Sequence, residues 1–156
     1  MDTQTLSVTR RTDTGKGPAR RLRMKGLVPA ILYGPKMESA LGIAVKPDDL
    51  RAAINTPRKF NTIIQMKLDD GSERFVLFKA FETDPVERKL LHADFLEVRL
   101  EEKVKVAVPV VLVGKPVGVT DGGILSQARY EIELWCLPKD IPEKLEIDVS
   151  ALKIGN

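Results

Sequence analysis

Residues 60–81 read FNTIIQMKLDDGSERFVLFKAF and predict a β-hairpin. Two apolar-rich runs, residues 60–68 and 74–81, flank the tripeptide Asp69-Asp70-Gly71. An Asp-Gly pair between such runs is among the strongest local signals for a hairpin turn, because glycine adopts a positive φ without steric cost. An antiparallel pair of strands is therefore expected here, and neighbouring strands should extend it into a sheet.

Strands and two short helices are predicted on both sides of this hairpin. Alternation of polar and apolar residues predicts strands at residues 5–11, 28–33, 41–45 and 90–98, with Leu6 and Val8 of the first one facing inward. Helices are expected from Pro18 to residue 25, since Gly26 suits a C-terminal cap, and at residues 47–54. About six strands and two short helices indicate an α+β or barrel-like domain.

The remaining residues predict a smaller, all-β unit. A charged junction at residues 99–102 precedes an alternating strand at 103–110, in which Pro109 suggests a sheet edge or a bulge. Residues 114–123 hold five glycines or prolines and are expected to form a loop, and strands follow at 130–137 and 145–149. We therefore predict two domains, residues 1–98 and 99–156, and no helix of useful length after Ile54.

Composition favours a globular protein. Of the 156 residues, 43% are hydrophobic and 30% are charged, which is too apolar for a disordered tail and too charged for a membrane bundle. The first residues are polar, so we expect no secretory signal, and no apolar stretch is long enough to cross a membrane. The single cysteine, Cys136, excludes an intramolecular disulfide, and together with the single histidine it cannot supply a zinc site. A reducing compartment and no metal or cofactor are expected.

The formal net charge of +3 conceals a gradient along the chain. Residues 1–98 hold 17 basic and 13 acidic residues, a net charge of +4, whereas residues 99–156 hold 8 basic and 9 acidic residues, a net charge of −1. Eight of the basic residues lie within the first 36 positions, against two acidic ones. A surface able to meet a polyanion is therefore expected only in the first part of the chain.

Signatures of enzymes are few. The tripeptide Gly15-Lys16-Gly17 lacks the second glycine and the Ser or Thr of a phosphate-binding P-loop, which favours a flexible turn that carries a cation. Cys136 lies about 44 positions from His92, in a different predicted domain, and is interpreted as a buried structural residue. The acidic pairs fall in a helix start, a turn and a junction, where local structure explains them. No catalytic activity is predicted.

The basic segment after this turn is the sharper feature. On a helix that begins near Pro18, the cations cover most of the solvent side, while Leu22 and the neighbouring Ala19 and Met24 are expected to pack inward. The cations in question are Arg20, Arg21, Arg23 and Lys25. Arginine forks suit phosphate and base-edge recognition, but basic helices on solvated surfaces are common. The helix alone leaves both interpretations open.

The predicted strand at residues 90–98 adds a second feature. With a period of two, Leu91, Ala93 and Phe95 share the inward face, and His92 and Asp94 point outward. Such a polar pair can read base edges or 2′-hydroxyl groups, or it can form a plain surface ion pair. Tyr33, at the end of another strand, can likewise be a core residue or a stacking platform.

These segments together resemble the bacterial ribosomal protein L-twenty-five family, also called the general stress protein Ctc family, in its long, two-domain form. The resemblance rests on Arg11, the turn at residues 15–17, and residues 19–23, 28–34 and 90–95 of the first part. In the second part it rests on residues 108–110, 113–119, 122–125 and 141–150. The match runs through nearly the whole chain in the same order.

The resemblance implies a mainly β fold with short helices, in which an N-terminal six-stranded β-barrel binds 5S ribosomal RNA at its loop E region. The protein would then be a structural part of the central protuberance of the large ribosomal subunit in the cytoplasm, a monomer when free, with neighbouring ribosomal proteins as further contacts. RNA-contacting positions of the family fall on Arg11, Arg20, Tyr33, His92 and Asp94. Lys16, Arg21 and Arg23 are neighbours expected to touch phosphates.

Two departures from the family pattern matter. Where many members have a polar stretch before a proline, this chain has Glu82-Thr83-Asp84-Pro85, which is acidic and puts an RNA contact from that loop in doubt. Long members also continue past the position of Gly155 with further strands. The resemblance therefore implies that residues 99–156 represent an incomplete C-terminal domain.

Two alternative functions follow from the same residues. The fold implied by the resemblance is similar to the anticodon-binding barrels of glutaminyl-tRNA synthetase, so a tRNA-related binding module is the nearest alternative. A hydrolase or redox enzyme would need His92 and Cys136 within hydrogen-bond reach of each other in a pocket.

Overall fold

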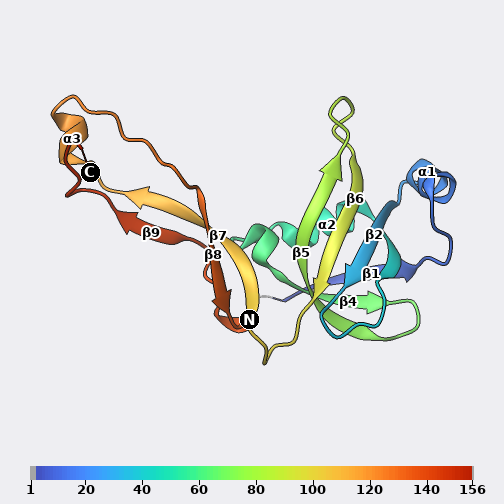
Figure 1. The fold of residues 1–156 in the computed structure, drawn as a ribbon. Helices are drawn as coiled ribbons and strands as arrows, with labels where there is room; N and C mark the ends of the chain where they lie inside the picture. Colours follow the sequence, from blue (N-terminus) through green and yellow to red (C-terminus); the bar gives the residue numbers. More distant parts are fainter. Residues whose placement is uncertain (1–2, 156) are drawn as a thin grey trace.

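The computed structural model describes residues 3–155 and has a barrel followed by a narrower second unit (Figure 1). The barrel comprises β1 (Gln4–Arg10), α1 (Lys16–Met24), β2 (Val28–Tyr33), β3 (Leu41–Val45), α2 (Pro47–Ile54), the 3-10 helix η1 (Lys59–Asn61), β4 (Ile63–Leu68), β5 (Glu73–Thr83) and β6 (Leu90–Glu97). The second unit comprises β7 (Val104–Val113), α3 (Val117–Thr120), β8 (Glu131–Cys136), the 3-10 helix η2 (Pro138–Asp140) and β9 (Leu145–Asp148). The mainly β prediction with short helices is confirmed.

The six strands of the barrel close in the order β1-β3-β2-β6-β5-β4. Closure depends on β1, which pairs in parallel with β4 from Gln4 opposite Ile64 to Val8 opposite Leu68. A second parallel pair joins β2 to β6, and the remaining pairs are antiparallel. A closed barrel has no free strand edge, so every strand backbone finds a partner inside the domain.

The barrel core follows the predicted alternation. Leu6 and Val8 face inward and are 1% and 5% exposed. Phe95 of β6 is fully buried and meets Phe78 of β5 edge to face, with ring centroids 5.5 Å apart. Helix α2 covers part of this core with its two buried residues, Leu50 and Ala53. The apolar face of each element therefore points to one shared interior.

The hairpin at the centre of the sequence is present, with one change. Asp70 holds its turn by accepting hydrogen bonds from the backbone N–H of Ser72 at 2.8 Å and from its hydroxyl group at 2.5 Å, and these bonds lower the pKa of Asp70. Gly71 has a φ of +83°, as an Asp-Gly turn requires. Residues 60–62 do not begin the strand, because the backbone turns there through η1. The hairpin therefore starts at Ile63.

The second unit is a three-stranded sheet in the order β8-β7-β9. Val106, Val108 and Val110 of β7 are buried in alternation, as predicted. Pro109 does not mark a sheet edge, since β7 is the middle strand. It lies where the pairing of β7 passes from β8 on one side to β9 on the other. The expected loop at residues 114–123 contains the four-residue helix α3, which the sequence analysis did not predict.

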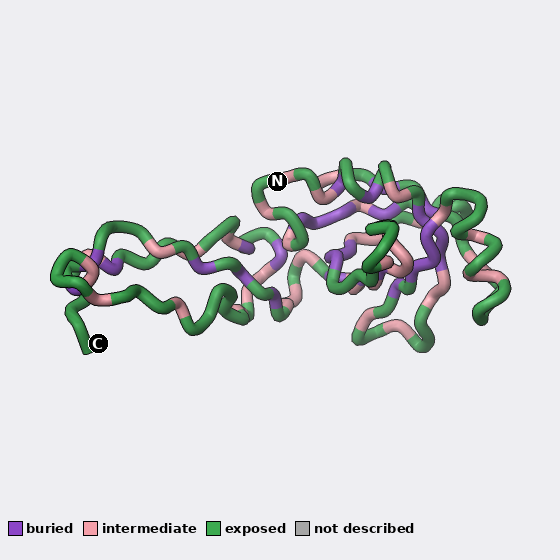
Figure 2. Tube along the Cα trace, turned by 90° about the horizontal axis from the view of Figure 1, so that it is seen from above, coloured by how far each residue is buried: buried purple, intermediate pink, exposed green. Residues whose placement is uncertain are grey.

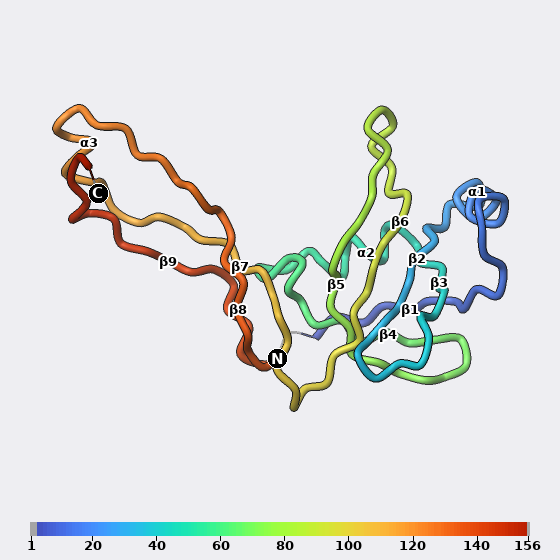
Figure 3. The backbone as a smooth tube through the Cα atoms, viewed as in Figure 1, coloured from blue at the N-terminus to red at the C-terminus, as the bar shows by residue number. Residues whose placement is uncertain are grey.

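A second apolar cluster joins the two units. Ile63, Leu77 and Val98 from the barrel side pack with Val106, Val108 and Ile141 of the second unit. Two barrel side chains also donate hydrogen bonds to backbone carbonyl groups of β7, Asn61 to Ala107 and Lys79 to Lys105, both at 2.7 Å. The chain after β6 passes at the foot of the barrel into β7 (Figure 3). Beyond this junction the second unit extends away and is mostly exposed (Figure 2). Among residues 3–155, no helix is long and apolar enough to cross a membrane.

Candidate RNA interface

Helix α1 lies on the barrel surface with no fully buried residue. Glycines with positive φ precede and follow it, Gly15 at 107° and Gly26 at 77°, so the backbone can enter and leave the helix sharply. Leu22 and Ala19 are half-buried, as expected, but Met24 is 79% exposed. The prediction that Met24 packs inward is wrong, because the helix touches the barrel along a narrower stripe than its sequence suggests. Its cations therefore face solvent over most of its circumference.

Arg23 ties α1 to the barrel. Its Nε donates a hydrogen bond to the carbonyl oxygen of Leu91 at 3.0 Å. That carbonyl lies at a register shift, since His92 pairs with Glu82 of β5 whereas Leu90 pairs with Thr83. The irregularity turns Leu91 away from the regular ladder. Arg23 thus fixes α1 beside the part of β6 that carries His92.

A basic hollow of about 230 Å³ lies between α1 and the end of β1. Its lining includes four cations and one carboxylate: Arg10, Arg11, Arg21, Lys25 and Asp13. Arg11 donates through Nη2 to the carbonyl oxygen of Asp13 at 3.1 Å. Its Nε is buried and finds no acceptor among residues 3–155. The excess of cations over carboxylates in its lining makes the hollow suited to an anionic oxygen.

Half of the cations of this hollow were predicted as RNA-binding residues. These are Arg11 and Arg21, which the structure brings together although they belong to different elements. Lys25 was named only as a cation of the basic helix and Arg10 entered only the charge count, and Arg10 is in part occupied by an ion pair with Asp70. Their position next to Arg11 and at the end of α1 was the available signal.

His92 and Asp94 point outward from β6 and pair with each other. The Nδ1 atom of His92 lies 3.0 Å from Oδ1 of Asp94, and their side chains are 27% and 34% exposed. The residues between and after them, Ala93 and Phe95, are fully buried, so the predicted alternation is confirmed for these two. Leu91, also predicted to face inward, is only half-buried, and Leu90 packs against the core instead, because the register shift interrupts the alternation there. A histidine that engages Nδ1 in this way presents Nε2 to solvent, and Asp94 retains its second oxygen as an acceptor.

Tyr33 belongs to the same outward face. It ends β2 opposite Leu96 of β6, one pair beyond the Phe95 position, and is 37% exposed. Burial raises the pKa of Tyr33, and the charge of Asp94 raises it further. The tyrosine hydroxyl group and the Asp94 carboxylate are therefore close enough to interact, and either can meet a polar ligand at the surface.

This pairing predicts a measurable titration. We expect Asp94→Asn to lower the pKa of Tyr33 only in part, because burial, the larger cause, remains. The tyrosinate absorbance near 295 nm reports it in a Tyr130→Phe background, where Tyr33 is the only remaining tyrosine. Glu82→Gln is the matched control and should leave the pKa of Tyr33 unchanged. An unaltered titration in the Asp94→Asn protein would separate Tyr33 from this site.

The acidic loop after β5 has a structural explanation. Oδ1 of Asp84 accepts hydrogen bonds from the backbone N–H groups of Val86 at 2.7 Å and Glu87 at 2.8 Å, which lowers the pKa of this carboxyl group. Asp84 therefore shapes the turn between β5 and β6. Its carboxylate oxygen serves as the acceptor that holds this turn.

His92 and Cys136, which a hydrolase or redox enzyme would need close together, lie in different units. Cys136 pairs with Val104 in the second sheet and packs at the junction cluster, whereas His92 lies near the β5–β6 turn of the barrel. Burial, and then the charge of Asp140, raises the pKa of the Cys136 thiol, which disfavours a nucleophilic thiolate. Within residues 3–155, no group of three His, Cys, Asp or Glu side chains could hold a metal ion.

The remaining site residues are available cations. Lys16 and Arg20 are exposed on α1, and in the described part of the chain none of the ion pairs involves Lys16, Arg20, Arg21 or Arg23. Fold and site together define a class of protein: a closed β-barrel whose surface helix carries unpaired cations beside an outward polar strand face, followed by a three-stranded sheet.

Comparison with known proteins identifies the family. Residues 6–95 match the Ribosomal L25p family, and residues 103–156 match the C-terminal domain of ribosomal protein TL5. The chain belongs to the Ribosomal L25p family. The family and the relatives carry the names of ribosomal proteins, in agreement with the resemblance seen in the sequence.

Several relatives are similar over nearly the whole chain, and each is named large ribosomal subunit protein bL25. The protein of Anaeromyxobacter sp. (strain Fw109-5) is 57% identical over 150 residues, which cover 96% of this chain and 63% of the relative. That of Anaeromyxobacter sp. (strain K) is 52% identical, with 99% and 64% covered. The Syntrophotalea carbinolica protein is 41% identical, with 97% and 73% covered. The chain thus spans less than two thirds of the length of the first two relatives.

Proposed function

We propose that this protein is a structural, non-catalytic component of the large ribosomal subunit that binds 5S ribosomal RNA. One observation carries the proposal: the unpaired cations of α1 lie beside the outward His92–Asp94 pair, because Arg23 ties the helix to the carbonyl oxygen of Leu91, the residue before His92. The names of the relatives support the ribosomal role. Cytoplasmic ribosomes, and within them the central protuberance, are the proposed location.

The cations near α1 and the polar face of β6 would recognise different parts of the RNA. Lys16, Arg20 and Arg21 would contact phosphates, and Arg11, which lines the basic hollow, would meet a phosphate oxygen there. His92, Asp94 and Tyr33 would form directed hydrogen bonds with base edges or 2′-hydroxyl groups. An irregular RNA helix such as loop E suits this division, because irregular RNA exposes base edges that a regular helix hides.

Residues 1–98 are proposed as the main RNA-binding domain. They carry the net charge of +4, whereas residues 99–156 carry −1. Phosphate contacts dominate the affinity of proteins for nucleic acids, so the electropositive part should supply most of it. Neighbouring ribosomal proteins are then the proposed contacts of the second unit.

The test is binding of the full chain to labelled 5S ribosomal RNA at about 150 mM salt, followed by competition. We expect unlabelled 5S RNA to displace the labelled RNA at much lower concentration than transfer RNA does. Equal displacement by transfer RNA would instead support the anticodon-binding type of module, and no binding of either RNA would overturn the proposal.

Lys16 provides a quantitative prediction for the phosphate contacts. We expect Lys16→Ala to reduce the slope of log K against log salt by roughly 0.7–0.9, because one fewer phosphate is neutralised. The measurement is a binding titration at several salt concentrations. Lys139→Ala, which removes an exposed lysine from η2 in the second unit, should leave the slope as it is. Equal slopes for the natural chain and Lys16→Ala would remove Lys16 from the interface.

A further inference from the structure

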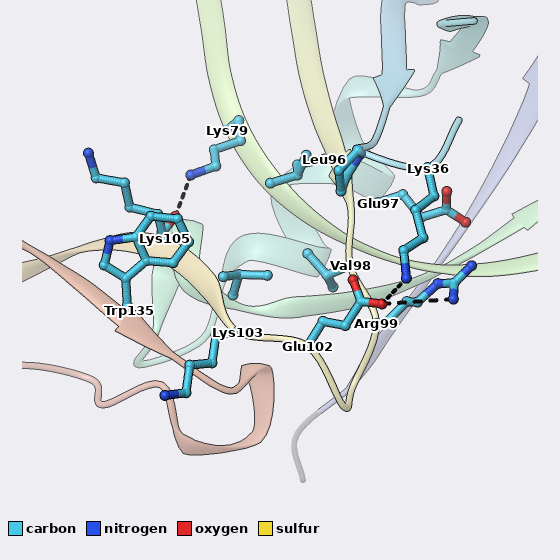
Figure 4. A pocket seen from close by; sticks show the side chains of 12 residues that line it. Lys36, Lys79, Leu96, Glu97, Val98, Arg99, Glu102, Lys103, Lys105 and Trp135 are labelled. Carbon is cyan, nitrogen blue, oxygen red and sulfur yellow. Dashed lines mark hydrogen bonds and ion pairs between the residues drawn. The ribbon is translucent and has the colours of Figure 1, made fainter. Parts of the chain in front are cut away.

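A cleft of about 400 Å³ lies at the junction of the two units (Figure 4). Its apolar lining comes from both sides, with Leu96 and Val98 from the barrel end and Val104 from β7. Trp135 of β8 forms one wall and is 68% exposed. A large aromatic ring left open beside an apolar floor is unusual for a purely structural tryptophan.

The cleft is also basic. Five cations line it, Lys36, Lys79, Arg99, Lys103 and Lys105, against the two carboxylates of Glu97 and Glu102. Both carboxylates are already paired, Glu97 with Arg74 at 2.9 Å and Glu102 with Lys36 and Arg99. Lys103 is exposed and has no ion pair among residues 3–155, and Lys79 uses one of its three N–H donors on the Lys105 carbonyl group. Lys105 is itself paired with Glu133 at 2.6 Å, so the charge that remains lies on Lys79 and Lys103 and favours an anion.

The cleft continues the candidate RNA interface. Because side chains alternate along β6, Leu96 points to the same outward face as His92 and Asp94. Tyr33 stands opposite Leu96 on β2. One strand face therefore leads from the His92–Asp94 pair, past Tyr33, to the cleft and its tryptophan.

We propose that this cleft holds an unpaired nucleotide of the bound RNA, with its base stacked on Trp135 and its phosphate near Lys103 and Lys79. This inference rests on the proposed RNA-binding function and extends it to the second unit. Stacking on an aromatic ring suits any base, and the lysines supply the charge that the adjoining phosphate requires. The barrel then provides most of the affinity for RNA. The nucleotide in the cleft adds a contact that requires residues of both units.

The intrinsic fluorescence of Trp135 reports directly on the cleft, because Trp135 is the only tryptophan in the chain. Two signals are followed with the full chain: anisotropy of fluorescein-labelled 5S ribosomal RNA, which measures overall binding, and tryptophan fluorescence during titration with unlabelled RNA. Short single-stranded oligoadenylate is titrated separately. We expect saturable quenching of Trp135 with both ligands, because a stacked base quenches indole emission.

Variants test whether the contact contributes to affinity. We expect Trp135→Ala to bind 5S RNA more weakly by a factor of about five or more. Trp135→Phe, which keeps an aromatic ring, should lose less affinity. Lys103→Gln should weaken the quenching by oligoadenylate. Tyr130→Ala is the matched control, since Tyr130 is equally exposed at 68% in the same unit but does not line the cleft.

The outcomes separate the two proposals. Normal anisotropy with unquenched Trp135 and full affinity of Trp135→Ala would overturn the cleft and leave the RNA-binding function in place. Loss of 5S binding with retained quenching by oligoadenylate would overturn the 5S function and support the cleft. Absence of both signals would overturn both.

Discussion

An Asp94→Asn protein is expected to bind 5S ribosomal RNA about tenfold to a hundredfold more weakly than the natural chain. Asparagine keeps the shape and an oxygen for Nδ1 of His92, which lies 3.0 Å from the carboxylate. It removes the charge and converts the second acceptor oxygen into a donor. A hydrogen bond to a charged group contributes about 1.5–3 kcal/mol, which corresponds to this loss of affinity.

Bulk electrostatics predicts the opposite sign for this substitution. A carboxylate beside a polyanion is repelled, so neutralising it should tighten binding unless the group makes a directed contact. The dissociation constants of Asp94→Asn and His92→Ala at fixed salt decide between the two, with circular dichroism to verify the fold. Tighter binding by Asp94→Asn would return the His92–Asp94 pair to the role of a surface ion pair.

The second large effect concerns stability. We expect Phe95→Ala to lower the free energy of unfolding by about 3–5 kcal/mol, because a fully buried ring leaves a cavity that the closed barrel cannot collapse to fill. The edge-to-face contact with Phe78 is lost as well. Urea denaturation followed by circular dichroism measures the change.

Phe81 is the matched control for this substitution. It stacks on Phe60 and Phe78, with centroids 5.6 and 5.9 Å away, but is 47% exposed. Phe81→Ala should therefore destabilise the protein clearly less than Phe95→Ala, since about half of its ring already contacts water. Similar losses for the two variants would contradict the assignment of Phe95 to the barrel core.

Local patterns were sufficient for most elements of the barrel. A period of two placed Leu6, Val8, Ala93 and Phe95 inside, and an Asp-Gly turn located the hairpin, because both signals act between near neighbours in the chain. The same alternation placed His92 and Asp94 together on the outward face. Strand faces, including half of the candidate site, could thus be predicted.

Contacts between distant segments could not be obtained in this way. The Arg23–Leu91 hydrogen bond depends on a register shift in β6, and the hollow around Arg11 depends on how α1 meets β1. Met24 was placed inward because periodicity describes a helix face but not how much of that face the barrel covers. The cleft at Trp135 requires the junction between the units, which no single segment of sequence encodes.

The parallel pairing of β1 with β4 determines when this barrel can form during synthesis. Gln4 to Val8 are synthesised well before their partners, Ile64 to Leu68, and β2 is likewise synthesised well before β6. Such non-local pairings slow folding, because the entropy cost of closing a long loop comes before the strand contacts can offset it. The cationic helix α1 lies between β1 and β2, in the segment that is synthesised before its strand partners. The most basic stretch of the nascent chain is therefore exposed before the barrel that carries it has formed.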